Sequence, residues 1–97
     1  MTLLSRGMKV HLALDLIDKS IDGLAMLVQG VLRQDPFSGH LFVFRGRKAN
    51  LINIVFWDGT GLCLFTKRLE QGVFLWPSNV KPGGTLALNS GAAVAAD

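Results

Sequence analysis

The chain has 97 residues, enough for one small domain, and 49% of them are hydrophobic while 18% are charged. This balance excludes a chain that is disordered throughout, and it supplies more apolar side chains than one small core readily hides. The formal net charge of +3 is too mild to indicate a strong nucleic-acid binder, so the placement of the basic residues matters more than their total.

The first part of the chain predicts one strand and one helix. Val10 to Leu14 is a short apolar run typical of a strand. From Ile21 to Leu32 apolar residues recur at helical spacing, and Asp18 or Ser20 can cap the start of this helix. Pro36 ends the helical pattern, because the residue before a proline disfavours helical backbone angles.

After a turn at residues 35–39 the pattern becomes that of β-strands separated by polar or glycine-rich turns. Two of these turns, 45–50 and 58–61, are expected to close hairpins. The fold class is therefore α+β: an antiparallel meander of about four to five short strands packed on one main helix. The strands expected after the helix are Leu41–Phe44, Leu51–Trp57, Leu62–Thr66 and Val73–Trp76.

Residues 1–77 are expected to form this single domain, and residues 78–97 a Gly/Ala-rich, weakly ordered tail. Both faces of the strand Leu51–Trp57 are apolar, but one helix can cover only one face of the sheet. The other face then needs a second layer, a partner protein or a second copy of the chain, the last of which would make a homo-oligomer. The residues expected on this partner surface are Val55, Trp57 and Trp76.

Candidate catalytic and metal-binding residues are few. His11 and His40 lack the further ligands that a metal site needs, so we expect structural roles for them. Cys63 lies in an apolar strand and is expected to behave as a small hydrophobic residue. The glycines of the turn 58–61 join two strands, which favours a hairpin over a dinucleotide-binding loop. We therefore expect no enzyme activity, no cofactor and no metal.

The cellular setting follows from the same residues. A single cysteine excludes an internal disulfide, which favours a reducing compartment. No stretch approaches the ~18 apolar residues that span a bilayer, and no signal peptide is visible. We expect a cytoplasmic protein without membrane contact.

Basic residues are concentrated in two turns, 45–50 and 67–72. Between Arg45 and Arg68 there are five basic residues against one acid, Asp58. In a meander the two turns fall at the same end of the sheet, where they could contact DNA phosphates, with Trp57 or Trp76 nearby for base stacking. The alternative, which the sequence leaves open, is that these are two solvated turns. The candidate DNA-binding residues are Arg45, Arg47, Lys48, Lys67 and Arg68.

Four motifs in order along the chain carry a family resemblance. They are Gln34–Arg47, Trp57–Phe65, Lys67–Glu70 and Phe74–Pro77. Together they closely resemble the TnpB accessory proteins of the insertion-sequence-66 family, which share only a name with the RNA-guided nuclease. The segment Asp18–Ala25 is similar to the same family's helix. The sequence departs from the family pattern from Pro82 onward, where a Gly/Ala-rich stretch stands in place of the family's Leu-rich helix.

The resemblance implies a role in transposition beside a separate transposase that carries the catalytic acids. The leading hypothesis is an accessory factor that binds the element's DNA through the basic turns. A second hypothesis is an adaptor that docks on the transposase of the same element through the apolar sheet face, around Val55 and Trp57, without touching DNA. A third is a degenerate copy that folds but has no activity.

Overall fold

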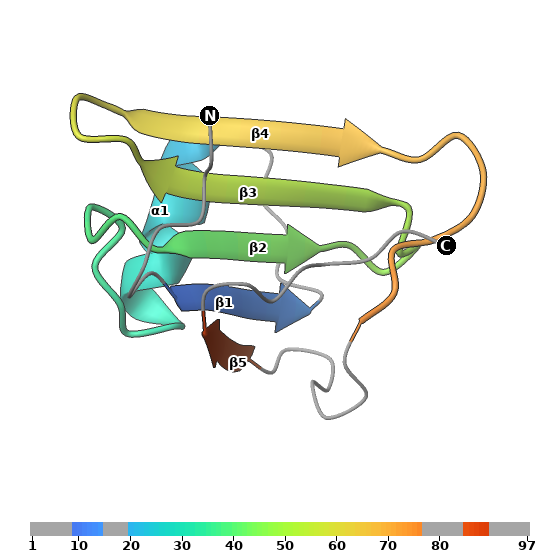
Figure 1. Ribbon diagram of the computed structural model, residues 1–97, viewed down its shortest axis with the longest axis horizontal. Helices are drawn as coiled ribbons and strands as arrows, with labels where there is room; N and C mark the ends of the chain where they lie inside the picture. The colour runs from blue at the N-terminus through green and yellow to red at the C-terminus, as the bar shows by residue number, and fades with distance from the viewer. Residues whose placement is uncertain (1–8, 15–19, 77–84, 90–97) are drawn as a thin grey trace.

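A mixed β-sheet with one helix on one of its faces makes up the computed structural model (Figure 1), which describes residues 9–14, 20–76 and the backbone of 85–89. The α+β class expected from the sequence is confirmed. The elements of the described residues are β1 (Lys9–Leu14), α1 (Ile21–Gly30), β2 (Leu41–Arg45), β3 (Leu51–Trp57), β4 (Leu62–Arg68) and β5 (Thr85–Asn89).

The strands lie in the order β4-β3-β2-β1-β5. Strands β2, β3 and β4 form the expected antiparallel meander. Strand β1, however, runs parallel to β2, from Val10 beside Leu41 to Leu14 beside Arg45. The prediction of a purely antiparallel sheet is therefore wrong. Parallel neighbours need a crossover of a dozen or more residues, and the segment containing α1 provides it.

Two predictions about the end of the chain also fail. The expected strand Val73–Trp76 is not formed; Phe74 makes only an isolated bridge, donating its N–H to the carbonyl of Ala49 at 2.7 Å. Residues 85–89, placed in a weakly ordered tail, instead form β5, which pairs antiparallel with β1. The rest of the tail, the boundary at residue 77 and the possible helix cap Asp18 lie outside the described residues.

Helix α1 begins with a well-formed cap. Ser20 has extended backbone angles, and its hydroxyl accepts a hydrogen bond from the N–H of Gly23 at 2.9 Å. Of the two expected caps, Ser20 is thus the one observed. The helix ends at Gly30, two residues earlier than the apolar pattern suggested. Leu24 and Val28 are fully buried on the side that faces the sheet.

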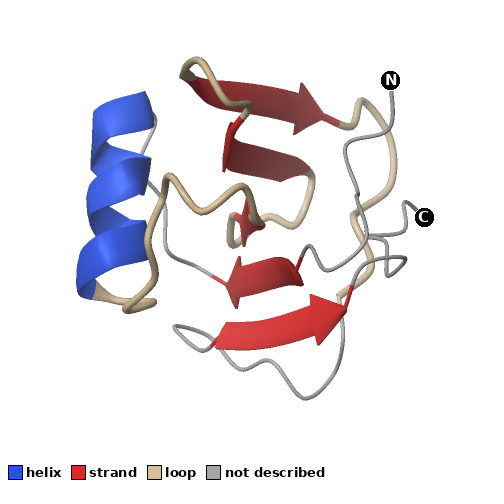
Figure 2. Cartoon of the chain, turned by 60° about the vertical axis from the view of Figure 1, so that its left-hand side comes forward, coloured by secondary structure: helices blue, strands red, loops and turns tan. Residues whose placement is uncertain are grey.

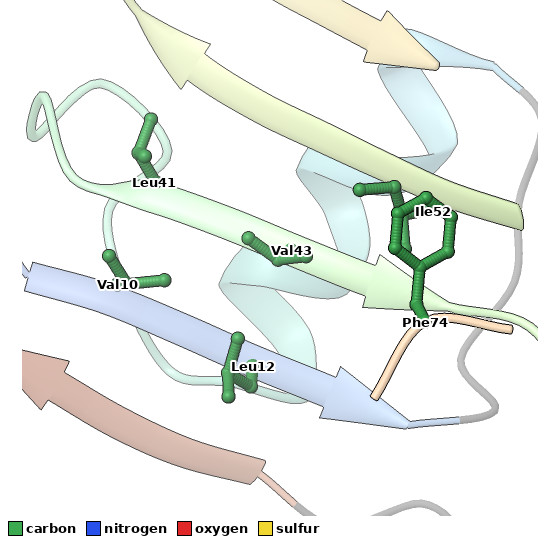
Figure 3. Close-up of a cluster of buried hydrophobic side chains, with 6 residues drawn as sticks. All are labelled: Val10, Leu12, Leu41, Val43, Ile52 and Phe74. Atoms are coloured by element: carbon green, nitrogen blue, oxygen red, sulfur yellow. The ribbon is translucent and has the colours of Figure 1, made fainter. Parts of the chain in front are cut away.

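The sheet buries apolar side chains on both faces, as the sequence predicted. Figure 2 shows α1 as a separate layer against one face. The cluster on this face consists of Ala13, Leu24, Val28, Phe42, Phe44 and Val55. The second cluster, on the opposite face, consists of Val10, Leu12, Leu41, Val43, Ile52 and Phe74 (Figure 3). There Phe74, from the segment after β4, packs beside Ile52 and covers one end of the sheet.

Candidate nucleic-acid interface

The two basic turns meet at one end of the sheet. Strands β2 and β4 run in the same direction on either side of β3, so both end where β3 begins (Figure 1). In the register, Ile52 of β3 lies between Arg45 of β2 and Lys67 of β4. Arg68 lies beside Leu51. The prediction that both turns share one end of the sheet is confirmed.

The turn between β2 and β3 projects two basic side chains into solvent. The N–H of Ala49 donates to the carbonyl of Gly46 at 3.0 Å, which closes a β-turn with Arg47 and Lys48 at its centre. Both central side chains are exposed. Ala49 has a φ of 62°, in the left-handed region that alanine adopts only at a cost. The turn therefore holds Arg47 and Lys48 on a short, hydrogen-bonded loop.

The second basic pair, Lys67 and Arg68, was expected in a turn but forms the last two residues of strand β4, which is two residues longer than predicted. Lys67 lies on the sheet face away from the helix, whereas Arg68, the next residue, lies on the helix side. Both side chains are exposed. Arg68 has an ion pair with Glu70, with 3.4 Å between Nη2 and Oε1, but both side chains are mostly in solvent. Such exposed pairs are worth little, so Arg68 remains able to contact an anion.

Arg45 differs from the other four basic residues, because its side chain packs against the protein. It shares a face with Leu41 and Val43, and its Nη1 donates to the carbonyl oxygen of Phe74 at 3.0 Å. Its guanidinium carbon lies 5.1 Å from the centre of the Trp76 ring, within cation–π range. Arg45 therefore anchors the segment that follows β4. We call the remaining four exposed side chains the basic end: Arg47, Lys48, Lys67 and Arg68.

The three residues expected on one partner surface are dispersed. Val55 is 0% exposed and lies in the cluster beneath α1, so it cannot contact a partner in this fold. Trp76 packs on the opposite face, under Arg45. Trp57 lies at the far end of β3, about 20 Å along the strand from the basic end, which also excludes it as a stacking residue there.

Trp57 instead forms an aromatic pair that the sequence reasoning missed. Its ring meets that of Phe37 edge to face, with 5.3 Å between centroids, and Phe37 is 53% exposed. Phe37 belongs to the turn at residues 35–39. In this turn the backbone N–H of Phe37 donates a hydrogen bond to the carboxylate of Asp35 at 2.9 Å. An aromatic side chain inside a polar turn was the available signal, because such residues are seldom left without a contact.

The hairpin turn between β3 and β4 stands at this far end of the sheet and holds an acid. Asp58 Oδ1 accepts hydrogen bonds from the N–H of Thr60 at 2.8 Å, from the Thr60 hydroxyl and from the N–H of Gly61, both at 2.9 Å. These bonds, with that from the Thr60 backbone the strongest, lower the pKa of Asp58 to about 2. The predicted hairpin is confirmed, and its carboxylate is ionised at neutral pH.

Both histidines have structural surroundings. His11 is buried and stacks on Phe42 with 4.9 Å between ring centroids. Burial, followed by the nearby charges of His40 and Lys9, lowers the pKa of His11. His40 Nδ1 accepts a hydrogen bond from the backbone N–H of Lys9 at 2.7 Å, which joins the loop before β2 to the start of β1.

The part of the chain that the structure describes contains no group of three or more His, Cys, Asp or Glu side chains that could hold a metal ion. No helix within residues 9–14 or 20–76 is long and apolar enough to cross a bilayer.

Comparison with known proteins gives one family. The family described as IS66 Orf2 like protein matches residues 8–94, a range that includes every strand and the helix. The uncharacterized protein y4hO of Sinorhizobium fredii strain NGR234 is 52% identical over 66 residues, which are 68% of this chain and 56% of y4hO. A second protein of that organism, y4jC, is 40% identical over 81 residues, 81% of this chain and 68% of y4jC. The chain thus spans little more than half the length of y4hO. None of the solved structures is a significant match.

Proposed function

The chain belongs to the family of IS66 Orf2-like proteins, and on that premise we propose that it is a non-catalytic accessory protein of transposition that contacts the element's DNA through the basic end. The family supports an accessory role in transposition. The DNA contact is our own step beyond it, and it rests on the geometry of the four exposed basic side chains. Turnover of a DNA substrate by the purified protein would refute the non-catalytic part.

One observation supports the proposed DNA contact: the side chains of Arg47, Lys48, Lys67 and Arg68 are all exposed at the same end of the sheet. Neighbouring strands are about 4.8 Å apart, so the two turns, two strands apart, lie about 10 Å from each other. Side chains at that spacing can reach several phosphates of one duplex. Contacts of this kind are electrostatic and give affinity without sequence preference.

The DNA contact is tested by changing Lys67→Ala together with Arg68→Ala. We expect weaker binding to a duplex carrying the element's end, measured by fluorescence anisotropy at moderate salt, with an unchanged circular dichroism spectrum. The control is Lys9→Ala, which removes one positive charge from an exposed position at the far end of the sheet. Equal affinities for the double variant and the unchanged protein would refute the proposal.

Contact with the transposase of the same element is a second candidate function, favoured by the Phe37–Trp57 pair. Half-exposed aromatic side chains are enriched at protein interfaces, and this pair lies at the end of the sheet away from the basic end. Phe37→Ser should then reduce capture of the transposase, whereas Lys67→Ala with Arg68→Ala should not. The capture is done with and without nuclease, so that DNA bridging is separated from direct contact.

A further inference from the structure

Strand β4 is an edge of the sheet, since among the described strands it pairs with β3 alone. Asp58 donates its N–H to the carbonyl of Gly61, and Leu69 donates to that of Asn50, so these are hydrogen-bonded pairs of the ladder. Pairs alternate along an antiparallel ladder, which directs the backbone of Cys63, Phe65 and Lys67 toward β3. The backbone groups that point outward, away from β3, belong to the residues that alternate with these three: Leu62, Leu64, Thr66 and Arg68.

This edge has few of the features that usually prevent pairing with another chain. Strand β4 has seven residues and contains neither proline nor glycine, and its two charged residues are both at its end. Its middle residue, Phe65, points away from the helix and is 49% exposed. A long edge strand with an exposed aromatic side chain at its centre is a surface on which another strand can pair.

The sequence of β4 suits antiparallel pairing with itself. Full overlap of two copies places a two-fold axis at Phe65, and then Leu62 faces Arg68, Cys63 faces Lys67, and Leu64 faces Thr66. In this register the outward backbone groups of one copy meet those of the other, so each such pair exchanges both hydrogen bonds. The two Phe65 side chains form a non-hydrogen-bonded pair, in which side chains are closest.

The charges also suit this arrangement. Lys67 and Arg68 face uncharged residues of the other copy instead of each other. Because the strands are antiparallel, the basic end of one β4 comes beside the turn that precedes the other, and this turn carries the Asp58 carboxylate. The basic residues of the two copies are therefore kept at opposite ends of the joined strands, which favours this register over one that brings the lysines together.

We propose that a second copy of this chain pairs antiparallel with β4, so that two sheets join into one continuous sheet with both helices on the same face. This interface differs from the apolar sheet face on which the sequence suggested a homo-oligomer. The interface and the proposed DNA contact share Lys67 and Arg68, which end β4, but they are tested separately, because Phe65 lies outside the basic end.

Sedimentation equilibrium tests the proposal. The unchanged protein should have twice the chain mass of 10.5 kDa, and Phe65→Lys should reduce it to the mass of one chain by placing two lysines across the axis. Leu75→Lys is the matched control, because Leu75 is 52% exposed but lies outside β4, and it should leave the dimer intact. A monomeric unchanged protein, or a dimer that persists in Phe65→Lys, would overturn the proposal.

Disulfide cross-linking gives a second measurement, which detects the paired strands directly and does not depend on a variant that breaks the dimer. The α-carbons of a non-hydrogen-bonded pair are about 4.5 Å apart, within the range that a disulfide spans. Phe65→Cys in a Cys63→Ser background should therefore form a cross-linked dimer under mild oxidation. Leu75→Cys in the same background should remain largely monomeric on a non-reducing gel. Equal cross-linking of the two variants would contradict pairing at β4.

Discussion

The charged side chains at the two ends of the sheet differ in their surroundings: those at one end are exposed to solvent, and the acid at the other end is hydrogen-bonded within its own turn. At the end where β3 begins, the side chains of Arg47, Lys48 and Lys67 extend into solvent, and none of them has a hydrogen bond to another described residue. At the end where β3 finishes, Asp58 accepts three hydrogen bonds from its own turn, and Trp57 packs against Phe37. The first end is available to a ligand, whereas the second uses its charge to stabilise a hairpin.

A similar contrast exists within the basic turns. Arg45 contributes to the same local excess of positive charge as its neighbours, but its guanidinium is committed to Phe74 and Trp76. Position along the strand explains the difference. Arg45 continues the alternation of Leu41 and Val43 on the inner face, while Arg47 and Lys48 stand at the centre of the turn. Charge density in a sequence therefore overestimates the number of basic side chains that can contact DNA.

The largest expected effect is a difference in folding stability between a variant of Arg45 and a variant of the basic end. Arg45→Ala removes a charged hydrogen bond and a cation–π contact, so it should lower the free energy of unfolding by about 2 kcal/mol. Arg47→Ala, on an exposed side chain, should change it by less than about 0.5 kcal/mol. Urea denaturation measures both. Equal stabilities of the two variants would show that Arg45 is not an anchor.

The next effect compares the two ends through DNA affinity. Lys67→Ala should weaken binding to a duplex threefold to tenfold, roughly 0.7 to 1.4 kcal/mol, because it removes one phosphate contact. Lys9→Ala removes the same charge from the far end and should leave the affinity nearly unchanged. Anisotropy titrations at one fixed salt concentration measure both. Similar losses in the two variants would mean that only net charge matters.

A smaller effect concerns the acid at the far end. The folded-state pKa of Asp58, about 2, is below its ordinary value of 3.8, so its ionised form stabilises the hairpin above pH 3.8. This contribution declines as the pH falls from about 4 through 2. Asp58→Asn should therefore lower the Tm by a few degrees at pH 7, and the difference from the unchanged protein should shrink toward pH 2. A constant difference across this range would contradict the assignment.

The smallest effect concerns the backbone of the basic turn. Ala49 has a φ of 62°, which glycine adopts without the steric cost that alanine has. Ala49→Gly should raise the free energy of unfolding by about 0.5 kcal/mol, because relief of this cost exceeds the greater unfolded-state freedom of glycine. Thermal unfolding measures the change. A lower Tm would show that the alanine methyl group makes a contact that outweighs the strain.

Much of the fold was predictable, because local patterns determine the meander. The helix, its Ser20 cap and the hairpin at 58–61 follow from spacing and turn chemistry. The parallel pairing of β1 with β2 and the strand β5 depend on contacts between distant segments, which a local pattern does not contain. A strand, a helix and another strand in sequence were nevertheless a usable sign of a parallel crossover.

The site was predictable in part for a similar reason. That both basic turns share one end of the sheet follows from strand direction alone. The orientation of Arg45, by contrast, depends on a partner 29 residues away, the carbonyl of Phe74. Val55 was assigned to the uncovered face because both faces of β3 are apolar, and only the position of α1 decides which of them is covered.

The salt dependence of DNA binding tests the central claim most directly. The logarithm of the affinity should fall linearly with the logarithm of salt concentration, with a slope of about −0.9 for each phosphate contacted, so four contacts give about −3.6. Changing Arg47, Lys48, Lys67 and Arg68 together to alanine should bring the slope close to zero, while Arg45→Ala at a temperature where it is folded should leave it unchanged. A slope that is the same in the unchanged protein and the fourfold variant would contradict a DNA contact at the basic end.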